Sequence, residues 1–272
     1  MTSARSILSV PGSSQRFLDK AANSAADVVM VDWEDGVAHG DKAAARGLTN
    51  GFLQTSARRV WVRVNASLTE QFAHDAAAAN QWTERSVPLV LPMSTLASAA
   101  LAARSIAGAP LIAMIETPEG VEQAADIARL PRVVGLMFGE YDFLATMAGT
   151  GASRMTHTGW AKSRIINAAA ATGKWAIAGP NADFSDPESL RQQAAQEAGL
   201  GFAGKLCIHP SQIDTVNEAF GPAPEYVSWA RDLLEEITER NHDGAFRFRG
   251  QMIDAPVIER ARTAVRLAGA VR

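Results

Sequence analysis

The stretch covering residues 110–143 most constrains the fold, because two wholly apolar runs in it flank a helix-like segment. The run LIAMI ends at Glu116, and the run VVGLMF ends at Gly139, with Glu140 and Asp142 just beyond. The segment between the runs opens with one proline and closes before another. A buried strand, a helix and a second buried strand form a βαβ unit, in which the two strands are parallel.

Acidic residues follow both of these strands. In α/β proteins the carboxyl ends of neighbouring parallel strands share one face of the sheet, and ligands bind at that face. Oxygen ligands such as Glu116 and Asp142 suit a hard divalent cation, and Mg²⁺ above all. The alternative is that each acid only caps the helix that follows it.

The whole chain alternates between strand-like and helix-like segments. Strict alternation over 272 residues favours a (β/α)8 TIM barrel over a sandwich. A doubly wound open sheet is the alternative, but no GxGxxG follows any strand, so its dinucleotide-binding form has no support. The eight strand-like segments are residues 5–10, 28–31, 60–65, 87–93, 111–115, 133–138, 175–179 and 204–210.

Residues 1–221 are enough to complete such a barrel, and residues 222–272 form a predicted C-terminal helical extension. In the extension, AFRFRGQMI alternates as a short hairpin does, and Asp254 precedes a final helix as a possible cap. The extension could pack on its own barrel or cross to a neighbouring subunit as a lid. Within the barrel, the Gly-, Ser- and Thr-rich residues 149–159 predict a mobile loop over the active face.

A second acidic group and an arginine follow earlier strands. Asp32, Glu34 and Asp35 come directly after a buried strand, where they are costly unless solvated, paired or bound to a cation or an arginine. Arg63 lies among valines near a strand end, and a buried arginine usually has an anion as partner. We expect a salt bridge from Arg63 to Glu34 or Asp35, which would also orient the arginine toward a substrate.

Composition excludes several classes of function. The formal net charge is -3 and there is no basic tail, so nucleic acid is not an expected partner. The single cysteine, Cys207, excludes an internal disulfide and a cysteine-based zinc cluster. The first residues lack the apolar core of a signal peptide, and no apolar run is long enough to span a bilayer. We therefore expect a cytoplasmic protein that does not contact a membrane.

A divalent cation beside Arg63 suits an α-keto or α-hydroxy acid, because the cation chelates two oxygens while the arginine stabilises charge on the carbonyl. This pattern indicates chemistry that makes or breaks the adjacent C–C bond, as in an aldol cleavage. A lysine Schiff base is another route, but Lys205 does not lie at its strand end. Cys207 and His209 are better explained as core packing and a strand end.

Several long motifs occur in order along the chain, and together they resemble the HpcH/HpaI aldolase and citrate lyase β-subunit family. They are RSILSVPG with FLDKAA, VDWEDGVAHGDKAAAR, VRVN, MIETPEG, GEYDF, KLCIHPSQIDTVNEAF and GAFRFRGQMIDAPVI. The resemblance extends from about residue 5 to about residue 268, and it is greatest to the CitE-like, malyl-CoA lyase and citramalyl-CoA lyase branches.

The resemblance implies a trimeric TIM barrel that uses Mg²⁺ to cleave or form 3-hydroxyacyl thioesters of coenzyme A. Glu116 and Asp142 would be the metal ligands, and Arg63 would hold the keto-acid part. Glu34 and Asp35 would support Arg63 and metal-bound water. Asp254 would be the acid/base group that a neighbouring subunit lends to the site.

For coenzyme A, the resemblance places the phosphates near Pro11-Gly12, with Arg16 and Lys20 as their partners. Two departures bear on the substrate: Met93 stands where the family usually has lysine, and Ala178 where it usually has an acid. The expected function is cleavage of malyl-CoA or citramalyl-CoA to an acyl-CoA and glyoxylate or pyruvate. The alternatives are hydrolysis of the thioester, a citrate lyase β-like subunit acting on a citryl thioester of a carrier protein, and a catalytically weak binding or assembly subunit.

Overall fold

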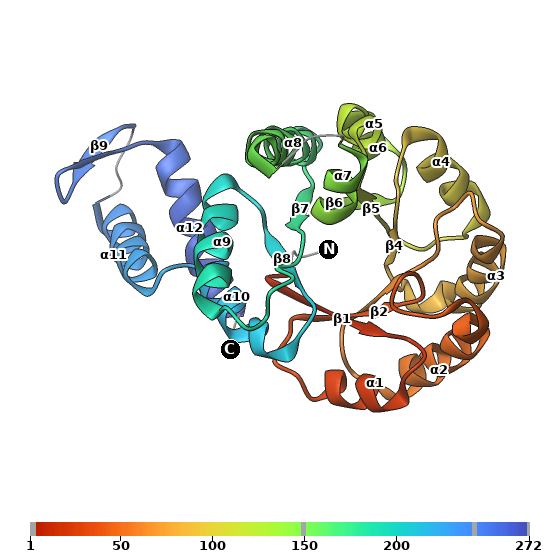
Figure 1. Ribbon diagram of the computed structural model, residues 1–272. Coiled ribbons are helices and arrows are strands. Elements are labelled where there is room, and N and C mark those ends of the chain that lie inside the picture. The colour runs from red at the N-terminus through yellow and green to blue at the C-terminus, as the bar shows by residue number, and fades with distance from the viewer. Residues whose placement is uncertain (1–3, 148–150, 241–243, 271–272) are drawn as a thin grey trace. The chain divides into compact units, whose positions relative to one another are not determined.

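The computed structural model describes residues 4–147, 151–240 and 244–270 and divides into two compact units, Met1–Ala219 and Phe220–Arg272. The first unit is a closed barrel of eight parallel strands, with β8 paired to β1 (Figure 1). The predicted (β/α)8 barrel is therefore confirmed. The strands are β1 (Ser6–Pro11), β2 (Val28–Asp32), β3 (Val60–Arg63), β4 (Leu89–Leu91), β5 (Leu111–Ile115), β6 (Val133–Phe138), β7 (Trp175–Ala178) and β8 (Gly204–Cys207).

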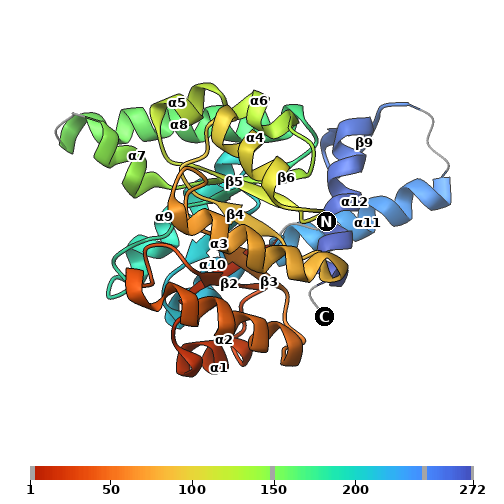
Figure 2. The same cartoon turned by 90° about the vertical axis from the view of Figure 1, so that its right-hand side faces the viewer.

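Helices surround the strands on the outside of the barrel (Figure 1). Figure 2 shows α6 beside α4 and α8, and these contacts shield β6 from solvent. The α-helices of this unit are α1 (Gln15–Ala22), α2 (Lys42–Thr55), α3 (Glu70–Ala79), α4 (Leu96–Ser105), α5 (Pro118–Glu122), α6 (Ala124–Arg129), α7 (Glu140–Thr146), α8 (Gly151–Ala171), α9 (Pro187–Leu200) and α10 (Ile213–Ala219).

Helix starts follow side-chain capping, as the sequence predicts. Ser14 accepts from the backbone N–H of Phe17 to cap α1, and Asp186 caps α9 with a proline at the first helical position. Ser94, which comes just before the N-cap residue of α4, does not cap that helix. The hydroxyl of Ser94 donates to the carbonyl oxygen of Leu91 instead, and Thr95 caps α4.

The predicted loop over residues 149–159 is also wrong for the part that the structure describes. Helix α8 begins at Gly151 and continues for 21 residues. Glycine, serine and threonine weaken a helix, but by no more than about 1 kcal/mol each. The later part of α8 buries Ala161 and Ile165 in the barrel wall, so tertiary packing supports the helix. Residues 149 and 150 lie outside the described part of the chain.

The barrel interior is a packed apolar core. Near the amino ends of the strands, Trp61 and Trp175 stack with ring centroids 5.4 Å apart and planes 10° apart. Gly135 lies against Trp175, where a Cβ atom would come within 2.3 Å of the indole, so only glycine fits. The fully or nearly fully buried members of this core are Ala4, Ile7, Val28, Met30, Trp61, Val90, Ile112, Met114, Met137, Ile177 and Leu206.

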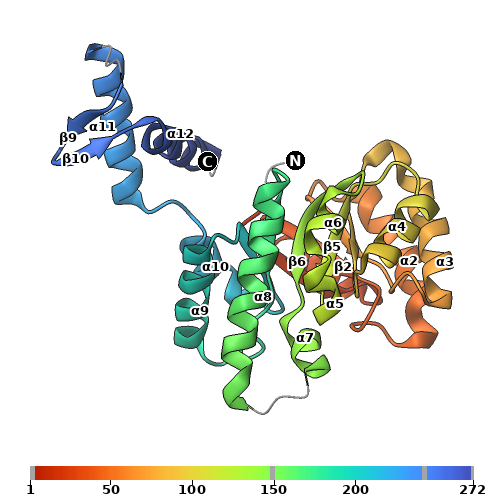
Figure 3. The same cartoon turned by 90° about the horizontal axis from the view of Figure 1, so that it is seen from above.

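The second unit consists of α11 (Pro224–Arg240), β9 (Phe246–Phe248), β10 (Gln251–Ile253) and α12 (Ala255–Ala270) (Figure 3). The predicted hairpin is confirmed, and its turn residues Arg249 and Gly250 both have positive φ, as a two-residue hairpin turn requires. The unit has its own small core around Leu233 and Ile253. Among the described residues of the chain, no helix has the length and apolarity to cross a membrane.

Candidate active site

The ends of β2 and β3 hold a bidentate ion pair. The register of the two strands sets Asp32 opposite Arg63. Nε of Arg63 lies 2.8 Å from Oδ1 of Asp32, and Nη2 lies 2.6 Å from Oδ2. The same carboxylate accepts from the backbone N–H groups of Glu34 and Gly36, both at 2.9 Å. Asp32 therefore fixes both the arginine and the loop that follows β2.

That loop brings two more carboxylates to Arg63. Oε2 of Glu34 lies 2.9 Å from Nη1 of Arg63, and Oδ2 of Asp35 lies 3.6 Å from it, so the expected salt bridge is confirmed. The loop approaches Asp32 so closely that a Cβ atom on Gly36 would come within 2.6 Å of Oδ2. All three acids were expected near Arg63, but Asp32 is its main partner, a pairing that the sequence pattern did not predict.

Burial is the largest influence on the pKa values of Glu34 and Arg63. Burial raises the pKa of Glu34 to about 8, with Glu116, Asp35 and Asp32 acting in the same direction and Arg63 opposing them. For Arg63, burial lowers the pKa, but the hydrogen bonds and negative charge of Asp32 outweigh it, so the guanidinium stays charged. Asp32 holds the arginine in its charged form, while Glu34 takes up a proton readily.

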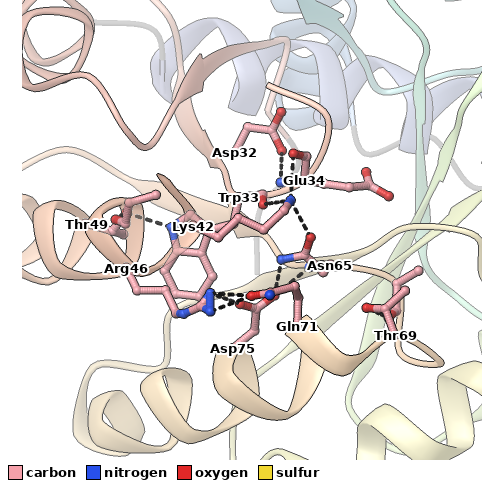
Figure 4. Close-up of polar contacts among 12 residues, drawn as sticks. Asp32, Trp33, Glu34, Lys42, Arg46, Thr49, Asn65, Thr69, Gln71 and Asp75 are labelled. Carbon is pink, nitrogen blue, oxygen red and sulfur yellow. Dashed lines mark hydrogen bonds and ion pairs between the residues drawn. The ribbon is translucent and has the colours of Figure 1, made fainter. Parts of the chain in front are cut away.

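A buried lysine holds the acidic loop from below (Figure 4). Nζ of Lys42 donates to the carbonyl oxygens of Trp33 and Glu34, at 2.8 Å and 3.0 Å, and to Oδ1 of Asn65 at 2.6 Å. These three acceptors use all three hydrogens of the ammonium group. Lys42 thereby ties the loop after β2 to the residue that follows β3.

The same network continues outward to α3 (Figure 4). Oδ2 of Asp75 accepts from the backbone N–H and the side-chain amide of Asn65, both at 2.7 Å, and Oδ1 accepts from Arg46 at 3.1 Å. The sequence pattern did not predict the roles of Lys42, Asn65 and Asp75. Lys42 and Arg46 are four positions apart and so lie on one face of α2, and this spacing was the one signal in the sequence for part of the network.

Glu116 occupies the end of β5 and is 2 % exposed. Its Oε2 atom accepts from the backbone N–H of Met93 at 2.6 Å. Met93 has φ +50°, a conformation that L-residues other than Asn and Asp rarely adopt, and this turn directs its N–H at the carboxylate. The side chain of Met93 is 40 % exposed at the end of β4.

Gly139 leaves the space that the Glu116 side chain occupies. A Cβ atom at Gly139 would come within 2.3 Å of Oε1 of Glu116. Asp142, in the first turn of α7, is exposed and close enough for its charge to act on Glu116. Burial raises the pKa of Glu116 to about 7, the backbone N–H of Met93 lowers it, and Asp142 raises it.

The two carboxylates suit a partly hydrated cation. In the described part of the chain, no group of three or more His, Cys, Asp or Glu side chains could hold a metal ion. Mg²⁺ typically binds through one or two carboxylates and keeps waters or substrate oxygens as its other ligands. Glu116 fits such an ion: its carboxylate is buried beside Gly139 and has a raised pKa, and a bound dication would stabilise its ionised form.

A buried chain of charged residues fixes the start of α7. Lys205 in β8 is wholly buried and lies 2.7 Å from Glu197, which in turn lies 2.9 Å from Lys162. Lys162 also lies 2.9 Å from Glu140, the first residue of α7 and two positions before Asp142. Nζ of Lys205 thus donates hydrogen bonds to Glu197 and to the carbonyl oxygen of Gly179. An amine held in this way does not suit the role of a Schiff-base nucleophile.

Of the four residues predicted to bind coenzyme A, two are at least partly buried and two are exposed. Pro11 ends β1 in register with Asp32, and the backbone N–H of Gly12 donates to the carbonyl oxygen of Asp32 at 2.8 Å. Arg16 and Lys20 are exposed on α1, one turn apart. The first pair therefore belongs to the edge of the Arg63 cluster, and the second pair is open to solvent.

The remaining candidate residues make local contacts within their own unit. Oδ1 of Asp254 accepts from the backbone N–H of Val257 at 3.2 Å, at the start of α12 in the second unit, as expected of a helix cap. Ala178 ends β7 and is buried. Cys207 is also buried, and burial raises its pKa to about 12, which confirms that it packs in the core. His209 caps a short 3-10 helix.

Comparison with known proteins identifies the family. The HpcH/HpaI aldolase/citrate lyase family matches residues 5–210. A citrate lyase subunit beta-like protein of Mycobacterium tuberculosis is 38% identical over 262 residues, which cover 94% of this chain and 92% of the relative. A (3S)-malyl-CoA thioesterase of Cereibacter sphaeroides is 33% identical over 272 residues, which cover 98% of this chain and 95% of the relative.

A solved structure agrees with these matches. Protein CitE from Mycobacterium tuberculosis, in complex with magnesium, acetoacetate and coenzyme A, superposes with a TM-score of 0.82 at 36% sequence identity. The superposition covers 98% of this chain and 99% of that one. The barrel, the acidic strand ends and these matches lead to one conclusion: the chain belongs to the HpcH/HpaI aldolase/citrate lyase family of lyases.

Proposed function

We propose that this protein is a Mg²⁺-dependent carbon–carbon lyase that cleaves or forms a 3-hydroxy-dicarboxylic acyl-CoA. Malyl-CoA and citramalyl-CoA are the favoured substrates, and the products are an acyl-CoA and glyoxylate or pyruvate. The observation that carries the proposal is the pairing of Glu116 and Asp142 with the Arg63 cluster at the carboxyl ends of β2, β3, β5 and β6. The magnesium and coenzyme A in the complex of the related CitE support it.

Glu116 and Asp142 would hold the cation. When bound, Mg²⁺ supplies a Lewis acid beside the carbonyl oxygen and a chelating centre for the adjacent carboxylate. Arg63 would bind the keto-acid part and stabilise the negative charge that develops on its oxygen. Within the described residues, Asp32 accepts from Nε and from one hydrogen of Nη2, and Glu34 pairs with Nη1. One hydrogen of Nη2 and one of Nη1, which has only Asp35 near it at 3.6 Å, are left to donate to a ligand.

Cleavage moves two protons. The substrate hydroxyl loses its proton to a base, the C–C bond breaks, and its electron pair passes into the thioester as an enolate. We assign Asp254 to the second proton: its carboxyl group would protonate the enolate carbon, and in synthesis its carboxylate would remove the same proton. Arg16 and Lys20 would contact the coenzyme A phosphates beside Pro11 and Gly12.

Because Asp254 lies in the second unit, we propose that the C-terminal extension of a neighbouring subunit delivers it in a homotrimer. Size-exclusion chromatography with light scattering checks the trimer. We also retain the prediction that the enzyme works in the cytoplasm, where its coenzyme A substrate would be supplied.

The test is a retro-aldol assay with Mg²⁺ and purified protein. The substrates are malyl-CoA, methylmalyl-CoA, citramalyl-CoA and citryl-CoA, and both the keto acid and any free thiol are measured. Glu116→Gln keeps an acceptor for the N–H of Met93 but removes the charge. Asp254→Asn keeps the helix cap. Keto acid release from one substrate, lost in both variants with their fold intact, supports the proposal.

Mixing the two inactive variants tests the delivery of Asp254 between subunits. If one subunit provides Glu116 and its neighbour provides Asp254, random mixing restores roughly one site in four. We expect roughly a quarter of the wild-type activity after the mixed subunits are unfolded and refolded together. Activity that stays at the level of the separate variants would mean that both residues act within one chain, or that Asp254 does not act.

Two other outcomes identify the alternatives. Release of free thiol without keto acid would identify a thioesterase, which the similarity to a (3S)-malyl-CoA thioesterase makes a specific second candidate. Mg²⁺ binding without any turnover would move the assignment to a carrier-protein substrate or a weakly catalytic subunit. Met93, which replaces the family's usual lysine beside Glu116, is the residue that favours this last outcome.

A further inference from the structure

A pocket with a mixed polar and apolar lining lies at the opposite end of the barrel from the candidate active site. It has a volume of about 310 Å³ and lies between the segments that lead into β3 and β4. Its lining includes two serines, Ser56 and Ser86, and three arginines, Arg58, Arg59 and Arg85. We call it the arginine pocket.

Two of these arginines are held in place by the main chain. Nη2 of Arg58 donates to the carbonyl oxygen of Ala26, and Nη1 of Arg85 donates to the carbonyl oxygen of Leu53 near the end of α2. Each contact uses one of five N–H donors, so most of the donor capacity of both groups is left. The pocket thus presents fixed guanidinium groups, which lose little conformational entropy when a ligand binds.

Two of the arginines, Arg58 and Arg85, have no acidic partner in the part of the chain that the structure describes. Among the described residues, no carboxylate lies within ion-pair distance of Arg58 or Arg85. The third arginine, Arg59, interacts with the negative charge of Asp27. Like charges gathered in one pocket repel one another unless an anion joins them.

One donor of Arg58, a residue of the pocket lining, has no acceptor among the described residues. Nε of Arg58 is buried, and within the described part of the chain it has no hydrogen-bond partner. A buried charged donor without a partner is costly, and such atoms commonly mark the place of a water or an ion. The fork formed by Nε and Nη of a guanidinium group matches two oxygens of a phosphate or a carboxylate.

We propose that the arginine pocket is a second anion site, which binds a small multivalent oxyanion independently of the catalytic site. Its ligand is a phosphate- or carboxylate-bearing molecule small enough for a 310 Å³ pocket. Since β3 and β4 begin at this pocket and end at the candidate active site, the two sites occupy opposite ends of the same strands. A ligand here therefore neither needs Mg²⁺ nor competes with the substrate.

Titration calorimetry without divalent cations tests this proposal, with inorganic pyrophosphate and citrate as separate probes at low ionic strength. We expect saturable binding of at least one probe, and the preferred probe identifies the ligand as phosphate- or carboxylate-bearing. Arg58→Gln and Arg85→Gln should each weaken binding about tenfold. Arg104→Gln, at an exposed site on α4, should leave it unchanged.

Further variants keep the result unambiguous. The double change Arg16→Gln, Lys20→Gln removes the exposed charges near the catalytic face and should not affect this binding. If Arg58→Gln does not fold, Arg85→Gln decides, because Arg85 is exposed. The proposal is overturned if neither probe binds, or if binding survives in Arg85→Gln and disappears in the Arg16, Lys20 double variant.

Discussion

Arg63 and Asp32 meet side by side at the carboxyl ends of β3 and β2, with Nε 2.8 Å from Oδ1 and Nη2 2.6 Å from Oδ2. The arginine side chain is 11% exposed, so this fork operates largely away from water. A bidentate ion pair of this kind fixes the orientation of the arginine side chain as well as its charge, because the guanidinium plane must align with the carboxylate. The remaining N–H groups of Arg63 are thereby aimed before substrate arrives.

Arg63→Lys keeps the charge and loses the fork. We expect kcat/KM in the retro-aldol assay to fall about 100-fold, because a single ammonium group cannot contact Asp32 at two points and the substrate as well. Arg104→Lys, at an exposed position, is the matched control and should retain full activity. Activity of Arg63→Lys within tenfold of wild type would show that the planar fork does not matter for the reaction.

The raised pKa of Glu34 gives a pH dependence of stability. Its folded-state pKa of about 8 lies above the ordinary value of 4.5, so between these values the folded protein holds a proton that the unfolded chain releases. The free energy of unfolding of the metal-free protein therefore decreases as pH rises through this window, by on the order of 5 kcal/mol from this group across the whole window. Its charged neighbours are Asp32, Asp35, Arg63 and Glu116.

Glu34→Gln imitates the protonated carboxyl group and should flatten this dependence. Urea unfolding in a chelator at pH 5.5, 7 and 8.5 measures the effect. We expect the wild-type midpoint to fall with pH more steeply than that of the variant. Parallel slopes for the two proteins would mean that Glu34 is already ionised in the folded state.

Local sequence patterns were sufficient to predict the barrel and the position of Glu116 and Asp142 at strand ends. Apolar runs that end on Glu116 or just before Asp142 fix both the strands and the face on which their acids lie. The cap at Ser14 follows from the same kind of local signal. In each case, the residues that decide the outcome are close together in the chain.

Contacts between distant residues could not be predicted in this way. Lys42 meets Asn65 only because β2 and β3 are neighbours with a particular register. The chain from Lys205 to Glu140 joins four elements, and no spacing in the sequence reveals it. The start of α8 at Gly151 was missed because packing of the later turns outweighs weak local propensity.

Lys42→Met should destabilise the protein strongly. Methionine fills most of the space but donates no hydrogen bond, so the carbonyl oxygens of Trp33 and Glu34 and the amide oxygen of Asn65 lose their buried donor. We expect the free energy of unfolding to fall by about 3 kcal/mol in urea. Lys20→Met, on the exposed face of α1, should change it by less than about 0.5 kcal/mol. Similar midpoints for both variants would contradict the role of Lys42.

Cys207 should not react in the folded protein. Burial raises its pKa to about 12, so at pH 8 the thiol is protonated and also shielded from reagents. We expect no reaction with a thiol reagent over about an hour in buffer. In guanidinium chloride at a denaturing concentration of about 6 M, one thiol per chain should react. Fast labelling without denaturant would show that the wall around β8 opens readily.

Gly139 is where a single methyl group should disable the metal site. In Gly139→Ala the new Cβ would fall 2.3 Å from Oε1 and 2.4 Å from Cγ of Glu116, so the carboxylate must leave the position in which it accepts from the N–H of Met93. We expect Mg²⁺ affinity, measured by calorimetry, to fall at least tenfold and stability to fall by about 1–3 kcal/mol. Gly47→Ala is the matched control, because nothing lies within 4 Å of its Cβ position in α2, and there alanine should stabilise the helix by about 0.5–1 kcal/mol. If Gly139→Ala binds Mg²⁺ as tightly as Gly47→Ala, Glu116 does not hold the cation in the position that we assign to it.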